Sequence, residues 1–183
     1  MTRPAATLTA FATLVLFAGC GGGSTNKSAG TKAQGGPIPI PAKEGEFRTV
    51  IPRGYTNNPS VAQYWARGPE AEDGLAINLI VVRQAVPKAV DLKTFADGTL
   101  GSFSHRAGRG SHLEQLSVDG EPAVAADYFV TASGTLKGRK THVRQVWVKH
   151  GPWVFFIRDI APPVQYAASL GALGEVLAKW HWQ

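Results

Sequence analysis

The chain has 183 residues, of which 44% are hydrophobic and 17% are charged. This length suits one ordinary domain with a tail, and the hydrophobic fraction excludes a fully disordered chain. The formal net charge is +6, but the basic residues are scattered rather than gathered in the dense stripe typical of nucleic-acid binding. The single cysteine, Cys20, excludes an intramolecular disulfide and a multi-cysteine metal cluster.

Residues 1–20 have the pattern of a segment that directs export. Arg3 provides a positive start, residues 5–18 carry no charge, and small residues lead into Cys20. An apolar run of about 14 residues is too short to span a hydrocarbon core of about 30 Å as a helix. The pattern therefore predicts a targeting segment rather than a membrane-spanning one.

This segment resembles the signal peptide of bacterial lipoproteins, which ends in a lipobox and a cysteine. The resemblance implies that residues 1–19 are removed and that Cys20 carries fatty acyl chains such as palmitate. Two or three acyl chains give stable anchoring, here at the extracytoplasmic face of the cell membrane. Phe17 departs from the pattern, because leucine is usual at that position. The alternative is an ordinary secretory signal followed by a chance cysteine.

Residues 20–44 are predicted to form the lipidated cysteine and a flexible Gly/Ser/Pro tether. Large apolar side chains are nearly absent from this stretch, so it cannot bury enough surface to offset its ordering entropy. Residues 37–41 alternate proline and isoleucine, which favours an extended polyproline II conformation. An SH3-type ligand is the alternative interpretation of these prolines.

Residues 45–183 are predicted to form a single α+β domain. Strand-forming sequences recur at 47–51, 61–66, 76–82, 112–118, 123–131, 140–149 and 153–160. The pair Asp119-Gly120 is typical of a two-residue hairpin turn. The short connections after residue 112 predict an antiparallel meander of three adjacent strands.

Two helices are predicted in the same domain. The first follows Asp91, a suitable N-cap, and runs through residues 92–106 with apolar side chains at helical spacing. The second opens at Pro162-Pro163, and its predicted apolar stripe consists of Tyr166, Leu170, Leu173, Leu177 and Trp180. If the chain becomes extended after residue 179, Trp182 falls on the same face as Trp180.

The order of these elements resembles the PsbP-like fold of photosystem accessory subunits, a Ran-binding protein and DcrB-like bacterial lipoproteins. The resemblance rests on the opening strand that runs into 52–55, the turn at 118–123, the strands around Trp147 and Trp153, and the terminal 179–182. It implies an antiparallel β-sheet with helices packed on it in an αβα sandwich. It implies no active site, because this superfamily shares a fold more than a function.

Catalytic and metal-binding signatures are absent from the sequence. It contains no GxSxG, HExxH, Walker A or GxGxxG motif. His105 and His112 flank a glycine-rich loop, but a metal site there would need Glu114 or Asp119, and solvated surface histidines are the favoured interpretation. We therefore expect no enzyme activity, no cofactor and no bound metal.

The function predicted from these features is a lipid-anchored binding or assembly module of the cell envelope. Its expected partners are the membrane, through Cys20, and an envelope protein, with no nucleic acid. Trp147 and Trp180 are expected to fill the core, whereas Trp65 and Trp182 are candidates for ligand or partner contacts. The alternatives are a small-molecule or lipid carrier with a cavity between helix and sheet, and an enzyme without a recognisable signature.

Overall fold

The structure, a computed structural model, describes residues 38–41, 46–58, 62–103, 112–131 and 138–183. The predicted signal peptide, Cys20, most of the predicted tether, His105 and the glycine-rich loop before His112 lie outside these residues. No helix among the described residues is long and apolar enough to cross a membrane.

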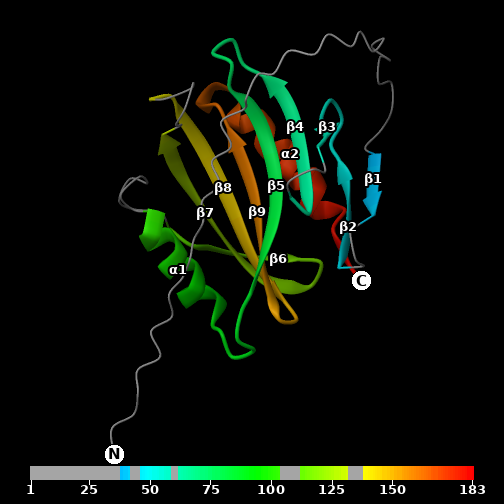
Figure 1. Cartoon of the computed structure of the whole chain (residues 1–183), viewed down its shortest axis with the longest axis vertical. Coiled ribbons are helices and arrows are strands. Elements are labelled where there is room, and N and C mark those ends of the chain that lie inside the picture. Colours follow the sequence, from blue (N-terminus) through cyan, green and yellow to red (C-terminus); the bar gives the residue numbers. More distant parts are fainter. Residues whose placement is uncertain (1–37, 42–45, 59–61, 104–111, 132–137) are drawn as a thin grey trace, which may run out of the picture.

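Two antiparallel sheets and two helices make up the domain (Figure 1). The spatial order of the larger sheet is β3 (Thr56–Asn57), β4 (Tyr64–Glu70), β5 (Ala76–Ala85), β9 (Trp153–Ala161), β8 (Lys140–His150), β7 (Glu121–Thr131) and β6 (Glu114–Val118). The smaller sheet has the order β1 (Ile38–Pro41), β2 (Phe47–Ile51) and β10 (His181–Trp182). Helices α1 (Leu92–Phe103) and α2 (Tyr166–Ala178) complete the fold, and the short 3₁₀ turn η3 (Pro163–Gln165) precedes α2. The predicted α+β class is confirmed.

The predicted three-strand meander is present and has a fourth strand, so that β6, β7, β8 and β9 lie side by side in the larger sheet. Its first hairpin turns at Asp119 and Gly120, which have φ angles of +46° and +83°. Positive φ at both central residues is what a type I′ turn requires, and its twist matches that of the flanking strands.

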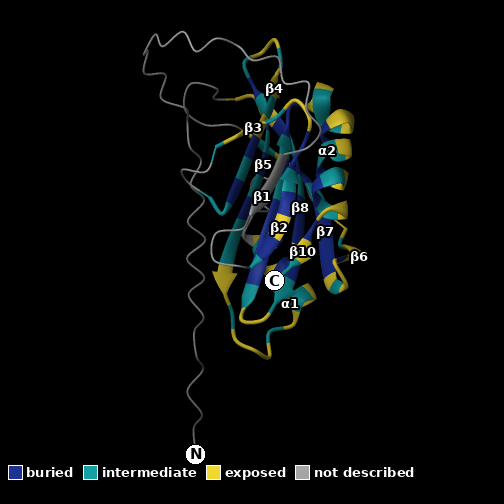
Figure 2. Cartoon of the chain, turned by 90° about the vertical axis from the view of Figure 1, so that its right-hand side faces the viewer, coloured by how far each residue is buried: buried dark blue, intermediate teal, exposed yellow. Residues whose placement is uncertain are grey.

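The two helices pack on opposite faces of the larger sheet. Along β9, Phe155 and Ile157 belong to the core under α2, whereas Val154 and Phe156 belong to the core under α1. This alternation follows from the two-residue period of a strand. Figure 2 shows buried residues along the strands and an exposed outer side on α2. The predicted layering is therefore present.

The first helix has the predicted N-cap. The backbone N–H of Thr94 donates to Asp91 Oδ1 at 2.8 Å, and hydrogen bonds from the side chain and the backbone of Thr94 hold the pKa of that carboxyl below its ordinary value. The structure describes this helix as far as Phe103, and residues 104–106 lie outside the described residues.

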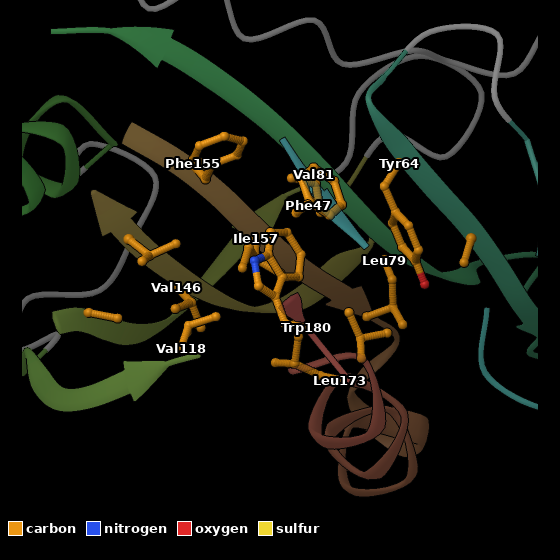
Figure 3. Packing of buried hydrophobic residues seen from close by; sticks show 14 of the residues in the cluster. Phe47, Tyr64, Leu79, Val81, Val118, Val146, Phe155, Ile157, Leu173 and Trp180 are labelled. Carbon is orange, nitrogen blue, oxygen red and sulfur yellow. The ribbon is translucent and has the colours of Figure 1, made fainter. Parts of the chain in front are cut away.

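The second helix buries a different stripe from the one predicted. Its buried residues are Ser169, Leu173 and Val176, while Tyr166, Leu170 and Leu177 stay partly exposed. The buried Ser169 donates a hydrogen bond to Asp159 on the sheet, which orients this face of the helix toward the core. Trp180 lies beyond the helix end and is still 1% exposed, at the centre of the core in Figure 3.

Strand β4 starts and ends later than predicted. It begins at Tyr64 and continues past Gly68 and Pro69, because the register with β5 shifts between Arg67 and Glu70. Such a bulge accommodates a proline that could not sit in a regular central ladder. A Cβ atom on Gly68 would lie 2.6 Å from the Tyr55 ring, so any larger residue there would force that ring to move.

The predicted tether boundary is wrong at its C-terminal end. Residues 38–41 form β1, which pairs antiparallel with β2 from Ile38 opposite Ile51 to Pro41 opposite Arg48. Proline is tolerated here because β1 is an edge strand, where a missing N–H does not interrupt an inner ladder. Strand pairing therefore includes residues 38–41 of the predicted tether.

Candidate functional site

The sheet face that carries α1 presents a row of side chains that crosses four strands. Trp65 on β4 is paired with Ile80 on β5, Ile80 with Arg158 on β9, and Arg158 with Gln145 on β8. Directly paired residues point to the same side of an antiparallel sheet. Neighbouring strands lie about 4.8 Å apart, so this Trp65–Gln145 row extends about 14 Å across the sheet.

Arg158 is the charged member of the row. Its Nε donates to Gln145 Oε1 at 2.9 Å, and its guanidinium carbon lies 5.5 Å from the centre of the Phe156 ring. No aspartate or glutamate of the described part of the chain forms an ion pair with it. Burial lowers the pKa of Arg158, and Tyr128 acts in the opposite direction. The group still stays charged at neutral pH, because an arginine side chain loses its proton only in strong base.

Gln145, next to Arg158, is fully buried, and only one of its two amide atoms has a hydrogen-bond partner among the described residues. Its Oε1 accepts hydrogen bonds from Arg158 Nε and, at 2.8 Å, from the hydroxyl of Tyr128. A guanidinium can only donate, so the amide oxygen must point toward it. Its Nε2 is then left without an acceptor among the described residues. A buried unmet donor costs about 1–3 kcal/mol, which makes this amide an exception that needs an explanation.

Apolar and partly exposed side chains surround this polar pair. The indole N–H of Trp65 donates to Asn78 Oδ1 at 2.9 Å, which fixes the ring at the β4 end of the row. Trp65, Ile80, Arg158 and Ile160 all keep partial solvent exposure. Helix α1 packs on β7 and β8, and Figure 1 shows it at the lower left of the sheet, beside β7. The row therefore runs from the half of the sheet beside α1 out to β4.

The chemistry of the row is that of recognition. Arg158 and Gln145 Nε2 offer hydrogen-bond donors, and their neighbours Ile80 and Ile160 offer apolar contact. The row itself contains no carboxylate, imidazole or thiol, so it has neither a nucleophile nor a general base.

A second polar cluster lies on the opposite face, under the start of α2. Arg144 pairs with Asp127 at 2.6 Å and with Glu114 at 2.5 Å, and the hydroxyl of Tyr166 donates to Asp127. Burial and the nearby Asp127 carboxylate raise the pKa of Tyr166. Each charge here has a partner, so the cluster holds strands β6, β7 and β8 and helix α2 together.

Among the described residues on the α2 side, only Asp159 and Ser169 resemble a catalytic pair. Ser169 Oγ donates to Asp159 Oδ2 at 2.6 Å, and both residues are 0% exposed. Burial raises the pKa of Asp159 to about 6, the Ser169 hydrogen bond opposes this, and Asp127 adds to it. A pKa near neutrality suits proton transfer. Because the pair is sealed from solvent, we assign it to the core.

Trp182, the other candidate from the sequence, has a packing role at the chain terminus. Its backbone N–H donates to Asp119 Oδ2 at 2.8 Å and its indole N–H to Val118 O at 3.1 Å. Its ring stacks on His150 at 4.3 Å and lies 5.3 Å from Trp180. As expected, Trp180 and Trp182 share one side, and strand β10 ties the terminus to the 119–120 turn. A contact of Trp182 with a partner stays a prediction.

His142 and His150 do not come together. His142 and His150 share a face of β8, as their spacing predicts, but His142 stacks on Tyr166 and His150 on Trp182. Burial lowers the pKa of His142, although Asp127 opposes the shift. Within the described ranges, no three His, Cys, Asp or Glu side chains are grouped so that they could hold a metal ion.

A pocket of about 480 Å³ lies at the turn between β8 and β9. Its lining residues are Lys88, Glu121, Lys149, Gly151 and Pro152. They come from strand ends and turns, so this pocket is not the cavity between helix and sheet that the carrier interpretation predicts.

Arg158 and Gln145 were not among the residues singled out from the sequence. The signal was present in two otherwise apolar strands, where Arg158 follows Phe155, Phe156 and Ile157, and where Gln145 precedes Val146. A polar residue on the buried parity of such a strand is unusual and points to a partner or a ligand.

No protein-family model and no curated protein matches the chain. Solved structures do match its fold. LpqN of Mycobacterium tuberculosis, described as involved in cell envelope biogenesis, is 11% identical with a TM-score of 0.61 over 79% of this chain and 88% of LpqN. Cyanobacterial PsbP from Synechocystis sp. PCC 6803 is 13% identical with a TM-score of 0.52, over 85% of this chain and 98% of PsbP. PA94 from Pseudomonas aeruginosa is 17% identical with a TM-score of 0.51, over 76% of this chain and 92% of PA94.

These similarities confirm the PsbP-like fold that the sequence predicts. At such low sequence identity the similarities indicate a shared fold only, and a fold does not specify a function. The case for a function therefore rests on the side chains of this chain.

Proposed function

We propose that this protein is a non-enzymatic binding module of the cell envelope, anchored by lipid on Cys20 at the extracytoplasmic face. Its binding surface is the Trp65–Gln145 row. One observation carries the proposal: Arg158, a half-buried cation without a carboxylate partner among the described residues, lies on a partly exposed apolar face. The involvement of LpqN in cell envelope biogenesis and the lipobox resemblance support the location.

The contrast between the two sheet faces supports binding rather than catalysis. On the α2 face, Arg144, Asp127 and Tyr166 satisfy one another, and Asp159 is covered although its Oδ1 has no partner among the described residues. On the α1 face, Arg158 is partly exposed and has no carboxylate partner among the described residues. Unsatisfied polar groups of this kind are costly and are retained in proteins mainly at functional sites.

Replacement of the lipidated residue, Cys20→Ala, is expected to release the protein from the membrane. The thiol is the acyl acceptor in the lipobox pattern, and a single hydrophobic segment of about 14 residues is too short to anchor as a spanning helix. Membrane fractionation at high salt, together with labelling by a palmitate analogue, measures the effect.

The matched control is Phe17→Leu, which restores the usual lipobox residue and should keep the protein labelled and membrane-bound. A stable membrane pool of Cys20→Ala at high salt would contradict the lipid anchor.

A further inference from the structure

We infer that the Trp65–Gln145 row binds the oxyanion of a small anionic amphiphile, with a carboxylate or phosphate on Arg158 and the apolar chain along Ile80 and Trp65. The inference rests on the proposed binding role of this row and adds the chemical class of its ligand.

The first argument is the unbalanced charge of the row. Transfer of a cation out of water without a counter-ion costs several kcal/mol, which an apolar residue at the same place would avoid. The other half-buried arginines of the described domain have carboxylate partners, since Arg144 pairs with Asp127 and Glu114, and Arg83 pairs with Glu46. Arg158 instead has an amide oxygen and an aromatic ring.

The second argument is the shape of the donors. Nε of Arg158 is taken by Gln145, so the two terminal nitrogens of the guanidinium remain for a ligand. A planar pair of N–H donors matches the two oxygens of a carboxylate or phosphate. Gln145 Nε2 adds a further donor beside it that lacks an acceptor in the described part of the chain. A cationic head group would be repelled by Arg158, and a neutral head group could accept hydrogen bonds but would leave the charge of Arg158 without a counter-ion.

The third argument is the apolar setting. Ile80 precedes Arg158 in the row, Ile160 lies on the same face of β9, and Trp65 closes the β4 end. A free inorganic anion would leave these partly exposed side chains in contact with water, whereas an alkyl chain would cover them at about 25 cal/mol per Å². Removal of water around the ion pair also strengthens it.

The test uses decanoate, decyltrimethylammonium and decyl maltoside, which share a tail and differ in head-group charge. The ¹⁵N-labelled full chain carries Cys20→Ala, so that no protein-bound acyl chain competes, and each probe is added below its micellar concentration. We expect decanoate to shift the Arg158 Nε–H and Trp65 indole N–H resonances and the cationic probe to shift neither. Inorganic phosphate, which lacks a tail, should bind at least tenfold more weakly than decanoate.

Variants separate recognition from a structural role. Arg158→Gln should weaken decanoate binding at least tenfold, as expected when a charge-assisted hydrogen bond is lost, and should not lower the unfolding midpoint. Arg158→Lys keeps the positive charge but lacks the planar pair of guanidinium donors, so it should give an intermediate loss of affinity. It provides the same test if Arg158→Gln does not fold. Arg53→Gln removes one exposed positive charge from a turn and should bind like the unaltered chain.

The outcomes that overturn the inference differ from those that overturn the proposed function. Equal binding of the three decyl probes, or unchanged decanoate affinity of Arg158→Gln, would overturn oxyanion recognition and leave the row as a binding surface. Phosphate binding as tight as that of decanoate would overturn the amphiphile. If no probe shifts the Trp65 and Arg158 resonances, both the inference and the proposed binding role of the row fail.

Discussion

Replacement of the terminal core residue, Trp180→Ala, is expected to lower the free energy of unfolding by about 3–5 kcal/mol. Trp180 is 1% exposed and stacks on Phe47 at 4.0 Å with an interplanar angle of 11°. Edge contacts with Phe155 and Trp182 enclose it further, so the surroundings cannot easily close around a cavity. Domains of this size hold only about 5–15 kcal/mol in total, so the loss removes a large part of the stability.

Urea denaturation followed by circular dichroism measures this change. Trp180→Phe is the matched control, because it keeps an aromatic ring against Phe47 and removes an indole N–H that has no acceptor among the described residues. It should recover most of the loss. A Trp180→Ala variant that unfolds at the same urea concentration as the unaltered chain would show that the terminus frays instead of packing.

The second large effect is a gain in stability from Asp159→Asn at neutral pH. Burial raises the folded-state pKa of Asp159 to about 6, whereas an unfolded aspartate has a pKa of about 3.9. Below about pH 3 both states are protonated and the carboxyl group has no effect. As the pH rises toward 6 the unfolded state ionises first, so the native state loses stability, by about 3 kcal/mol once the pH exceeds 6. Asparagine removes this cost and still accepts the Ser169 hydrogen bond.

The difference in unfolding free energy between Asp159→Asn and the unaltered chain should therefore be largest at pH 7.5 and shrink toward pH 4.5. Asp97→Asn is the control, because Asp97 is an exposed carboxylate paired with Lys93 and such pairs contribute about 0–1 kcal/mol. A loss of stability at pH 7.5, or a difference that does not vary with pH, would mean that Asp159 is held ionised by its surroundings.

Local sequence signals predicted much of this fold. The Asp119-Gly120 pair has the backbone angles that its residue types favour, Asp91 caps α1, and the burial of Trp147 and Trp180 follows from their apolar neighbours at strand and helix spacing. These features depend on residues within one or two turns of each other, where propensity and periodicity act.

Features that depend on distant partners could not be predicted in the same way. Ser169 is buried because Asp159 on the sheet accepts its hydrogen bond, which turns the helix away from the predicted stripe. Strand β1 forms because the edge of β2 offers backbone groups, although the composition of residues 38–41 resembles that of a linker. Such tertiary effects override local propensity.

The residues of the candidate site are even harder to predict from the sequence than these parts of the fold. Trp65 is a candidate from the sequence because it is a large aromatic. Its neighbours in the row come from β5, β9 and β8, so the row depends on how distant strands are aligned. Trp65 and Arg158 are 93 positions apart in the sequence. Sequence reasoning could place Arg158 in a strand. It could not show that Arg158 has no carboxylate partner among the described residues.

The most direct measurement is a crystal structure of the full chain grown with decanoate. The account predicts carboxylate oxygens within hydrogen-bond distance of the terminal nitrogens of Arg158, with the alkyl chain lying over Ile80 toward Trp65. Decanoate bound elsewhere, or a row without ligand in which the Arg158 guanidinium has turned to a carboxylate of the protein itself, would contradict it.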